Sequence, residues 1–201
     1  VTILHKNNDL EGCTHIILPG GFSYGDYLRS GAIARFSPIM DSVIKHANNG
    51  GFLFGVCNGF QILCESGLLP GALLHNNSRK FICKNVHIKS ATTNSLITSQ
   101  VPLNKALKIP IAHGEGKYFA DADTIKKLIA NDQILFRYCD ENGNITDEAN
   151  PNGAIDNIAG VCNAQRNVFG MMPHPERAAD KELSNEDGRF LFESILETVS
   201  A

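Results

Sequence analysis

The most informative part of this chain is Phe52-Leu53-Phe54-Gly55-Val56-Cys57-Asn58-Gly59-Phe60. Its first five residues are apolar or glycine and predict a buried strand, and the residues after Cys57 predict a helix that ends at Gly67. A nucleophilic residue between two glycines at a strand-to-helix junction is typical of a nucleophile elbow, here with Cys in place of Ser. The glycines are needed because larger side chains two positions away would clash in so sharp a turn.

Cys57 is therefore a candidate nucleophile. The helix after it would place the positive end of the helix dipole beside the sulfur, which favours the thiolate. The backbone N–H of Asn58 would lie where an oxyanion forms. The five residues of the elbow also fit a structural cysteine at a tight turn, so the assignment depends on a base elsewhere in the chain.

Outward from this stretch, strand-like apolar runs alternate with helical patterns over most of the chain. We expect strands over residues 1–4, 15–18, 52–56, 133–138, 158–163 and 168–172, and helices over 37–48, 58–66, 123–130 and from 184. Shorter strand candidates lie over 73–74, 81–83, 86–88 and 108–111, the last with a proline typical of an edge strand. The alternation predicts one α/β domain over residues 1–201, with an open, mostly parallel sheet and helices on both faces. Active residues of such folds lie at the carboxyl ends of strands.

His174 is the candidate base for Cys57. It follows the apolar run 168–172, it has a proline on each side, and Glu176 is close enough to orient its imidazole. A lone histidine after a strand is more often a satisfied polar residue, but a His-Pro-Glu sequence combined with an elbow cysteine favours catalysis. His113, in a glycine-rich turn after another strand, is the rival and could line the same pocket.

A second glycine loop, Leu-Pro-Gly-Gly-Phe-Ser-Tyr-Gly-Asp, spans residues 18–26. It follows a predicted strand, and its backbone at Gly20 and Gly21 could approach a ligand closely. It matches neither a G-K-[S/T] phosphate loop nor a dinucleotide fingerprint. We interpret it as the source of a second oxyanion N–H, with ordinary turn chemistry as the alternative.

Composition excludes several classes of protein. The chain has 201 residues, 43% of them hydrophobic and 19% charged, with a formal net charge of −3. The slight acidic excess argues against a nucleic-acid partner, and no apolar run is long enough for a membrane span. The six cysteines are scattered without a C-x-x-C or zinc-ligand spacing, so we expect reduced thiols, no metal site and a cytoplasmic location.

These motifs together resemble the class I (triad) glutamine amidotransferases, a family with a flavodoxin-like α/β fold. The resemblance rests on Pro19-Gly20-Gly21, Gly55-Val56-Cys57-Asn58-Gly59 and Met172-Pro173-His174-Pro175-Glu176-Arg177. The segments Phe22-Ser23-Tyr24-Gly25-Asp26, Phe81-Ile82-Cys83 and Pro110-Ile111-Ala112-His113-Gly114 are similar to the free-standing glutaminase subunits of purine biosynthesis. The resemblance covers nearly the whole chain.

The resemblance implies hydrolysis of glutamine to glutamate and ammonia. Cys57 would form a γ-glutamyl thioester, His174 would move protons and Glu176 would orient His174. The N–H groups of Asn58 and of Gly20 or Gly21 would hold the oxyanion. Gln61 would help to seat the amino-acid end of glutamine. Three further residues would line the same pocket, namely Asn76, Ser78 and Lys80.

The resemblance also implies partners. Ammonia would pass to a large synthetase subunit that converts formylglycinamide ribonucleotide to the amidine, assisted by a small accessory subunit. ATP and magnesium would bind to the synthetase, and this chain would carry no cofactor. Members of the family open with a strand and a helix before the segment that matches residues 1–4, and both are missing here. We therefore expect that the sequence is a fragment or that this strand was lost.

Two alternatives to this function remain open. The chain could serve as a glutaminase in another biosynthetic pathway, or it could be a non-catalytic pseudo-glutaminase that scaffolds a synthetase. A peptidase-like relative with the same elbow is a further possibility, which the His-Pro-Glu ending disfavours.

Overall fold

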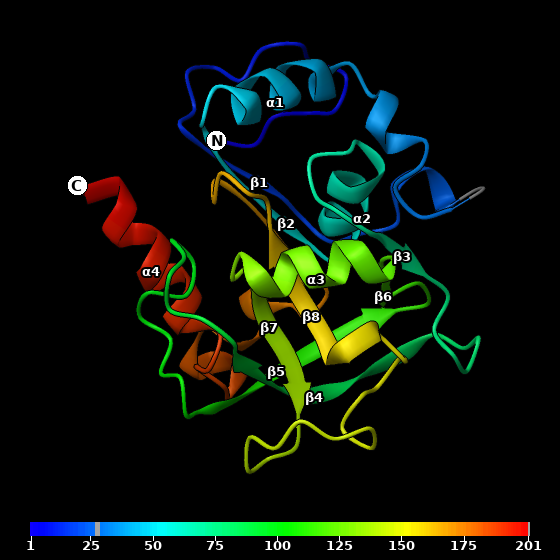
Figure 1. Cartoon of the computed structure of the whole chain (residues 1–201). Coiled ribbons are helices and arrows are strands. Elements are labelled where there is room, and N and C mark those ends of the chain that lie inside the picture. The colour runs from blue at the N-terminus through cyan, green and yellow to red at the C-terminus, as the bar shows by residue number, and fades with distance from the viewer. Residues whose placement is uncertain (27–28, 201) are drawn as a thin grey trace.

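A computed structural model describes residues 1–26 and 29–200, and its centre is a seven-stranded sheet (Figure 1). The strand order is β1-β2-β9-β8-β7-β4-β5. The strands are β1 (His15–Leu18), β2 (Phe52–Val56), β4 (Ile82–Ser90), β5 (Ala106–His113), β7 (Ile134–Cys139), β8 (Ile158–Cys162) and β9 (Val168–Met171). Strands β3 (Ala72–Leu74) and β6 (Lys117–Phe119) form a separate antiparallel pair.

Four α-helices accompany the strands in the part of the chain that the structure describes. They are α1 (Ile39–Asn48), α2 (Asn58–Glu65), α3 (Ala122–Ala130) and α4 (Arg189–Ser200). Short 3₁₀ helices include η1 (Ser23–Asp26), η2 (Ala34–Phe36), η3 (Ile155–Asn157), η4 (Pro175–Ala178) and η5 (Lys181–Leu183). Helix α2 packs against β1, β2 and β9, and α1 packs against β2. None of the helices in the described ranges is long and apolar enough to cross a membrane.

The sheet is mixed, so the prediction of a mostly parallel sheet is wrong although the α/β class is confirmed. Only the pairs β1–β2 and β2–β9 are parallel, and the pairs β9–β8, β8–β7, β7–β4 and β4–β5 are antiparallel. The short turn between β8 and β9 forces these two strands to run in opposite directions, because a parallel connection needs a long crossover. A continuous buried apolar run predicts a strand but not the direction of its neighbours.

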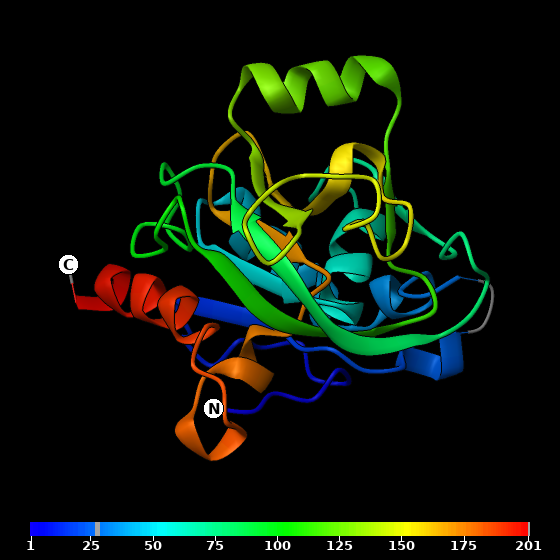
Figure 2. The ribbon, with the colours of Figure 1, turned by 90° about the horizontal axis from the view of Figure 1, so that it is seen from below.

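The sheet curls strongly, and this curl carries its far edge back toward the parallel part. In Figure 2, β4 and β5 bend across the molecule as one curved ribbon. The N–H of His174, which precedes η4, donates to the carbonyl oxygen of Pro110 in β5 at 2.8 Å. Strand β5 lies at the edge of the sheet, as the proline in its middle predicts. The segment after β9 is therefore held by a strand from the opposite end of the sheet.

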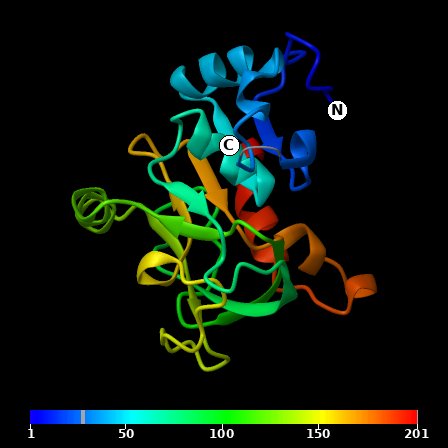
Figure 3. The same cartoon turned by 90° about the vertical axis from the view of Figure 1, so that its right-hand side faces the viewer.

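The core follows from the apolar runs. Every residue of β2, β8 and β9 is buried, as expected for strands covered on both faces. Helix α1 contributes its buried face of Met40, Val43 and Ala47 to the same core, and α4 contributes Leu191 and Ile195. Helix α3 buries only Leu128, and Figures 2 and 3 show it standing out from the sheet.

Three expected element boundaries are wrong. Residues 1–4 form no strand, and Val1 is 96% exposed. Strand β1 is the edge of the sheet, and none of the described strands pairs with residues 1–4. Helix α1 begins at Ile39 and has Pro38 rather than Ser37 at its N-cap position, without a side-chain cap. Helix α4 begins at Arg189 rather than at 184, because residue 184 ends η5 in a left-handed conformation.

Candidate active site

The elbow between β2 and α2 has the geometry that its glycines predict. Cys57 has φ of 51° and ψ of −105°, and its N–H donates to the carbonyl oxygen of Met171 at 2.8 Å. A Cβ on Gly59 would lie 2.0 Å from the carbonyl oxygen of Leu18, and one on Gly55 would lie 2.7 Å from the carbonyl carbon of Gly59. Only glycine fits at both positions, so the turn places Cys57 at the N-terminus of α2.

His174 and Glu176 form a hydrogen-bonded pair at the start of η4. His174 is 2% exposed, and its Nδ1 lies 2.6 Å from Glu176 Oε1. Because a carboxylate accepts, Nδ1 donates this hydrogen bond, and Nε2 is the ring nitrogen left to act as a base. In the described part of the chain this Nε2 is buried and has no hydrogen-bond partner. The pair thus presents a base to the interior of the site.

Gly20 shows that the structure brings Cys57 and His174 together. A Cβ built on Gly20 would lie 2.7 Å from His174 Cε1 and 3.5 Å from Cys57 Cβ. The imidazole and the cysteine side chain therefore both border the same glycine, which leaves them room to approach each other. The loop of residues 18–26, the elbow and the His-Pro-Glu turn meet at this point.

Two backbone elements surround the cysteine with polar groups. Asn58 is the first residue of α2, where backbone N–H groups have no partner within the helix, and Gly20 and Gly21 lie in the neighbouring loop. On the other side, Cys57 Sγ lies 3.7 Å from the carbonyl oxygen of Ala112 in β5. The structure thus places all three residues of the predicted oxyanion hole, Gly20, Gly21 and Asn58, around the elbow.

A cavity of about 270 Å³ opens beside Cys57. Its lining includes Gly21, Gln61, His113 and Glu115 in addition to the cysteine. The side chain of Gln61 accepts from Asn58 Nδ2 at 2.9 Å and donates to the carbonyl oxygen of Glu115 at 2.6 Å. Of the four residues predicted to bind glutamine, the structure brings Gln61 to this cavity.

The other three predicted glutamine-binding residues do not line the cavity. Asn76 is buried against the turn that follows β5. Its Nδ2 donates to the carbonyl oxygens of Lys80 and His113, and its Oδ1 accepts from the N–H of Gly116. Ser78 and Lys80 are exposed. Asn76 therefore holds in place the turn that carries His113.

His113 is a buried neutral imidazole. Its Nδ1 lies 3.1 Å from Asn76 Oδ1, which can only accept, so Nδ1 carries the proton. Burial, and then the nearby His174, lower the pKa of His113 to about 4. A histidine with this pKa stays uncharged at neutral pH. Of these two histidines, His174 has a carboxylate partner in Glu176, whereas the Nδ1 of His113 is bonded to an amide, and this difference supports the prediction of His174 as the base.

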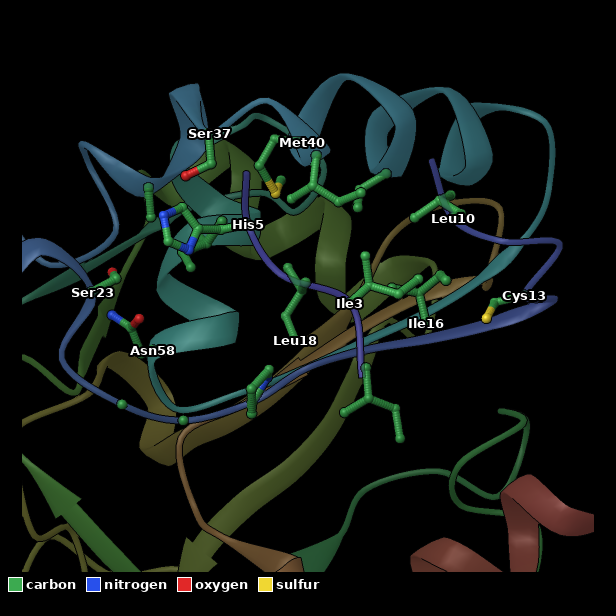
Figure 4. A pocket seen from close by; sticks show the side chains of 18 of the residues that line it. Ile3, His5, Leu10, Cys13, Ile16, Leu18, Ser23, Ser37, Met40 and Asn58 are labelled. Atoms are coloured by element: carbon green, nitrogen blue, oxygen red, sulfur yellow. The ribbon is translucent and has the colours of Figure 1, made fainter. Parts of the chain in front are cut away.

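A larger cavity of about 560 Å³ runs along the outer edge of β1 and does not include Cys57 in its lining. Figure 4 shows its apolar side chains between α1 and β1, among them Ile3, Leu10, Ile16 and Met40. Gly21 and Phe22 line both cavities. Of these two cavities, the smaller one is the candidate active site because Cys57, the predicted nucleophile, lines it. No cluster of His, Cys, Asp and Glu side chains suited to a metal ion occurs in residues 1–26 or 29–200.

Comparison with known proteins identifies the family. A family model described as a CobB/CobQ-like glutamine amidotransferase domain matches residues 1–189. Phosphoribosylformylglycinamidine synthase subunit PurQ of Koribacter versatilis is 56% identical over 197 residues, which cover 98% of this chain and 85% of the relative. The PurQ subunit of Acaryochloris marina is 52% identical over 199 residues, or 99% of this chain and 85% of that protein.

Solved structures agree with this assignment. A chain in the structure of PurLQS from Thermotoga maritima is 43% identical and has a TM-score of 0.84, with 96% of this chain and 83% of that chain covered. The glutaminase domain of Trypanosoma brucei CTPS, at 13% identity and a TM-score of 0.56 over 92% of this chain and 72% of that chain, shares the fold alone. This chain therefore belongs to the CobB/CobQ-like glutamine amidotransferase family, within its branch of PurQ glutaminase subunits of phosphoribosylformylglycinamidine synthase.

Proposed function

We propose that this chain hydrolyses glutamine at Cys57 and supplies the ammonia to a synthetase that makes formylglycinamidine ribonucleotide. The observation that carries the proposal is the meeting of the elbow cysteine and the Glu176-bound imidazole at Gly20. A nucleophile, a base and a group that orients the base are the parts that acyl transfer needs. The names and the structure of the relatives support the choice of pathway.

The reaction would proceed in two halves. His174 Nε2 takes the thiol proton while the sulfur of Cys57 attacks the amide carbon of the glutamine side chain, and backbone N–H groups bind the oxyanion. The carbon–nitrogen bond then breaks, and the leaving nitrogen takes the proton from His174 to depart as ammonia. A water molecule attacks the resulting thioester, gives a proton to His174, and the thiol leaves with that proton as glutamate is released.

The proposal also covers the partner subunits, the cofactors and the compartment in which this chain works. We place ATP and magnesium on a large synthetase partner, and no cofactor on this chain, which works as one amidotransferase domain over residues 1–201. A small accessory subunit completes the complex, as the name PurLQS of the Thermotoga maritima structure indicates for that protein. The compartment we propose is the cytoplasm, where a thiol nucleophile remains reduced.

Trapping the thioester tests the proposal. The chain, assembled with its synthetase and accessory subunits, is mixed with glutamine, quenched in acid and digested for mass spectrometry. We expect a γ-glutamyl adduct on the peptide that contains Cys57, and loss of both the adduct and ammonia release in Cys57→Ala. Removing the nucleophile of such a site lowers turnover by roughly a millionfold.

The matched control is Cys83→Ala, which removes an exposed cysteine outside the cavity. It should retain both the adduct and the turnover. Ammonia release by Cys57→Ala at the normal rate would remove Cys57 from the mechanism. A complex that assembles normally but never releases ammonia from glutamine would instead favour the scaffolding alternative.

A further inference from the structure

The cavity beside Cys57 has a marked charge asymmetry. Its described lining contains one carboxylate, that of Glu115, and neither lysine nor arginine. Glu115 lies in the turn that follows β5, and its side chain is 12% exposed. Free glutamine carries a neutral amide, an α-ammonium group and an α-carboxylate, so the lining attracts one end of the substrate more than the other.

The carboxylate of Glu115 is held in place from two sides. Its Oε2 accepts from the backbone N–H of Ser30 at 2.9 Å, and its Oε1 lies 3.3 Å from Nε2 of the exposed His75. A carboxylate has about four lone-pair directions, so these two contacts leave acceptor capacity for a ligand. An ammonium group needs such acceptors when it leaves water.

The same residue is also fixed relative to the nucleophile. Gln61 lies one helical turn after Cys57, and its Nε2 donates to the backbone carbonyl of Glu115 at 2.6 Å. The distance between the acidic side chain and the elbow is therefore set by helix α2 and the β5 turn together. Two groups held at a fixed separation favour a substrate whose two ends match that separation.

We propose that Glu115 binds the α-ammonium group of glutamine and thereby selects the free amino acid as the substrate. This inference rests on the proposed glutaminase function, and it makes Glu115 a binding and specificity residue rather than a catalytic one. Its carboxylate would contact the ammonium group at one end of the cavity while Cys57 attacks the amide at the other. The competing role is a structural latch, in which Glu115 only holds the Ser30 segment closed.

The test compares two substrates in the complete synthetase complex. One is glutamine, and the other is 4-carbamoylbutanoate, which keeps the amide and the carboxylate but lacks the amino group. The wild type should prefer glutamine strongly in kcat/KM. In Glu115→Gln we expect the KM for glutamine to rise about tenfold or more, with kcat changed by no more than about threefold. The kcat/KM for 4-carbamoylbutanoate should stay within about threefold of the wild type.

The two roles predict different patterns. A latch would lower kcat/KM for both substrates by the same factor in Glu115→Gln, and an unchanged preference for glutamine in that variant would overturn the proposal. Glu115→Asp, which keeps the negative charge, should recover part of the preference. Glu141→Gln, an exposed residue in the loop after β7, controls for the loss of one negative charge and should behave as the wild type.

The proposal stays testable if Glu115→Gln does not assemble. Wild-type hydrolysis of 4-carbamoylbutanoate as readily as glutamine would then reject ammonium recognition directly. Failure of this inference is distinguishable from failure of the glutaminase function, because Cys57→Ala in the same assay reports on the chemistry alone.

Discussion

At Gly20 the site has no room for a side chain. A Cβ on Gly20 would lie 2.7 Å from His174 Cε1, a separation that two unbonded carbon atoms cannot keep. The imidazole could remain in the site only by shifting away from residue 20. Misplacement of a catalytic group by about 1 Å can cost roughly a hundredfold in rate. Glycine is required here for space, and the requirement comes from a residue far away in the sequence.

His113 makes the stability of the protein depend on pH. Its pKa is about 4 in the folded protein, mainly because of burial, whereas an unfolded histidine has its ordinary value of 6.5. Between these values the unfolded chain binds the proton more readily, so stability is complete above pH 6.5 and falls as the pH decreases toward 4. We expect this residue alone to remove roughly 2 kcal/mol from the free energy of unfolding between pH 7 and pH 5.

Urea unfolding at several pH values measures this effect. The comparison is with His113→Asn, which keeps a polar side chain of similar shape but does not titrate in this range. The variant should be less stable than the wild type at pH 7, and its stability should decline less steeply on acidification. Parallel pH profiles for the two proteins would contradict the prediction.

At the scale of elements, the contact of α2 with β1 depends on Gly59. Gly-to-Ala changes in a helix usually stabilise it by roughly 0.5–1 kcal/mol. Here the added Cβ would lie 2.0 Å from the carbonyl oxygen of Leu18, which is backbone and cannot turn aside. We therefore expect Gly59→Ala to destabilise the protein by roughly 3 kcal/mol or more, because the helix must move away from the strand.

Thermal or chemical unfolding of Gly59→Ala measures both the size and the sign of the change in the free energy of unfolding. Ordinary helix propensity predicts that this substitution stabilises the protein, so a loss of stability is the diagnostic result. A variant as stable as the wild type, with full glutaminase turnover, would show that α2 can shift without disturbing the elbow. That result would contradict the close packing of α2 on β1.

At the scale of the whole molecule, a clasp joins the segment before α4 to strand β5. Asp187 accepts from the backbone N–H of Lys108 at 2.9 Å and forms an ion pair with Lys105 at 2.7 Å. Asn185 Nδ2 donates to the carbonyl oxygen of Lys108 at 2.6 Å. This clasp ties the C-terminal segment to the same strand that contacts the backbone of His174.

Asp187→Ala should therefore lower the free energy of unfolding by about 1–3 kcal/mol, because it leaves a backbone donor and Lys105 without their carboxylate. The glutaminase activity of the folded variant should remain within a few-fold of the wild type, since the contact of His174 with Pro110 is retained. The control is Asp123→Ala, whose ion pair on α3 is exposed and should not affect stability measurably. Equal unfolding curves for Asp187→Ala and the wild type would show that the clasp contributes nothing.

Features that depend on residues close together in the chain could be predicted from the sequence. The spacing of Gly55, Cys57 and Gly59 predicts the elbow, although in the structure Gly59 is required because a Cβ there would meet Leu18 of β1. His174 and Glu176 pair within one short turn, and the buried runs of β2, β8 and β9 are visible as continuous apolar stretches. For the same reason the α/β class and the family could both be predicted before any coordinates were known.

Features that depend on contacts between distant segments could be seen in the folded chain alone. Apolar runs carry no information about strand direction, so the mixed and curled sheet was not predictable from them. The curl places β5 beside His174. The family resemblance implies that Asn76 lines the cavity, whereas the structure places Glu115 in its wall and Asn76 against the turn that carries His113. The physical reason is that a side chain's neighbours are set by the packing of the whole sheet, whereas a turn is set by the residues within it.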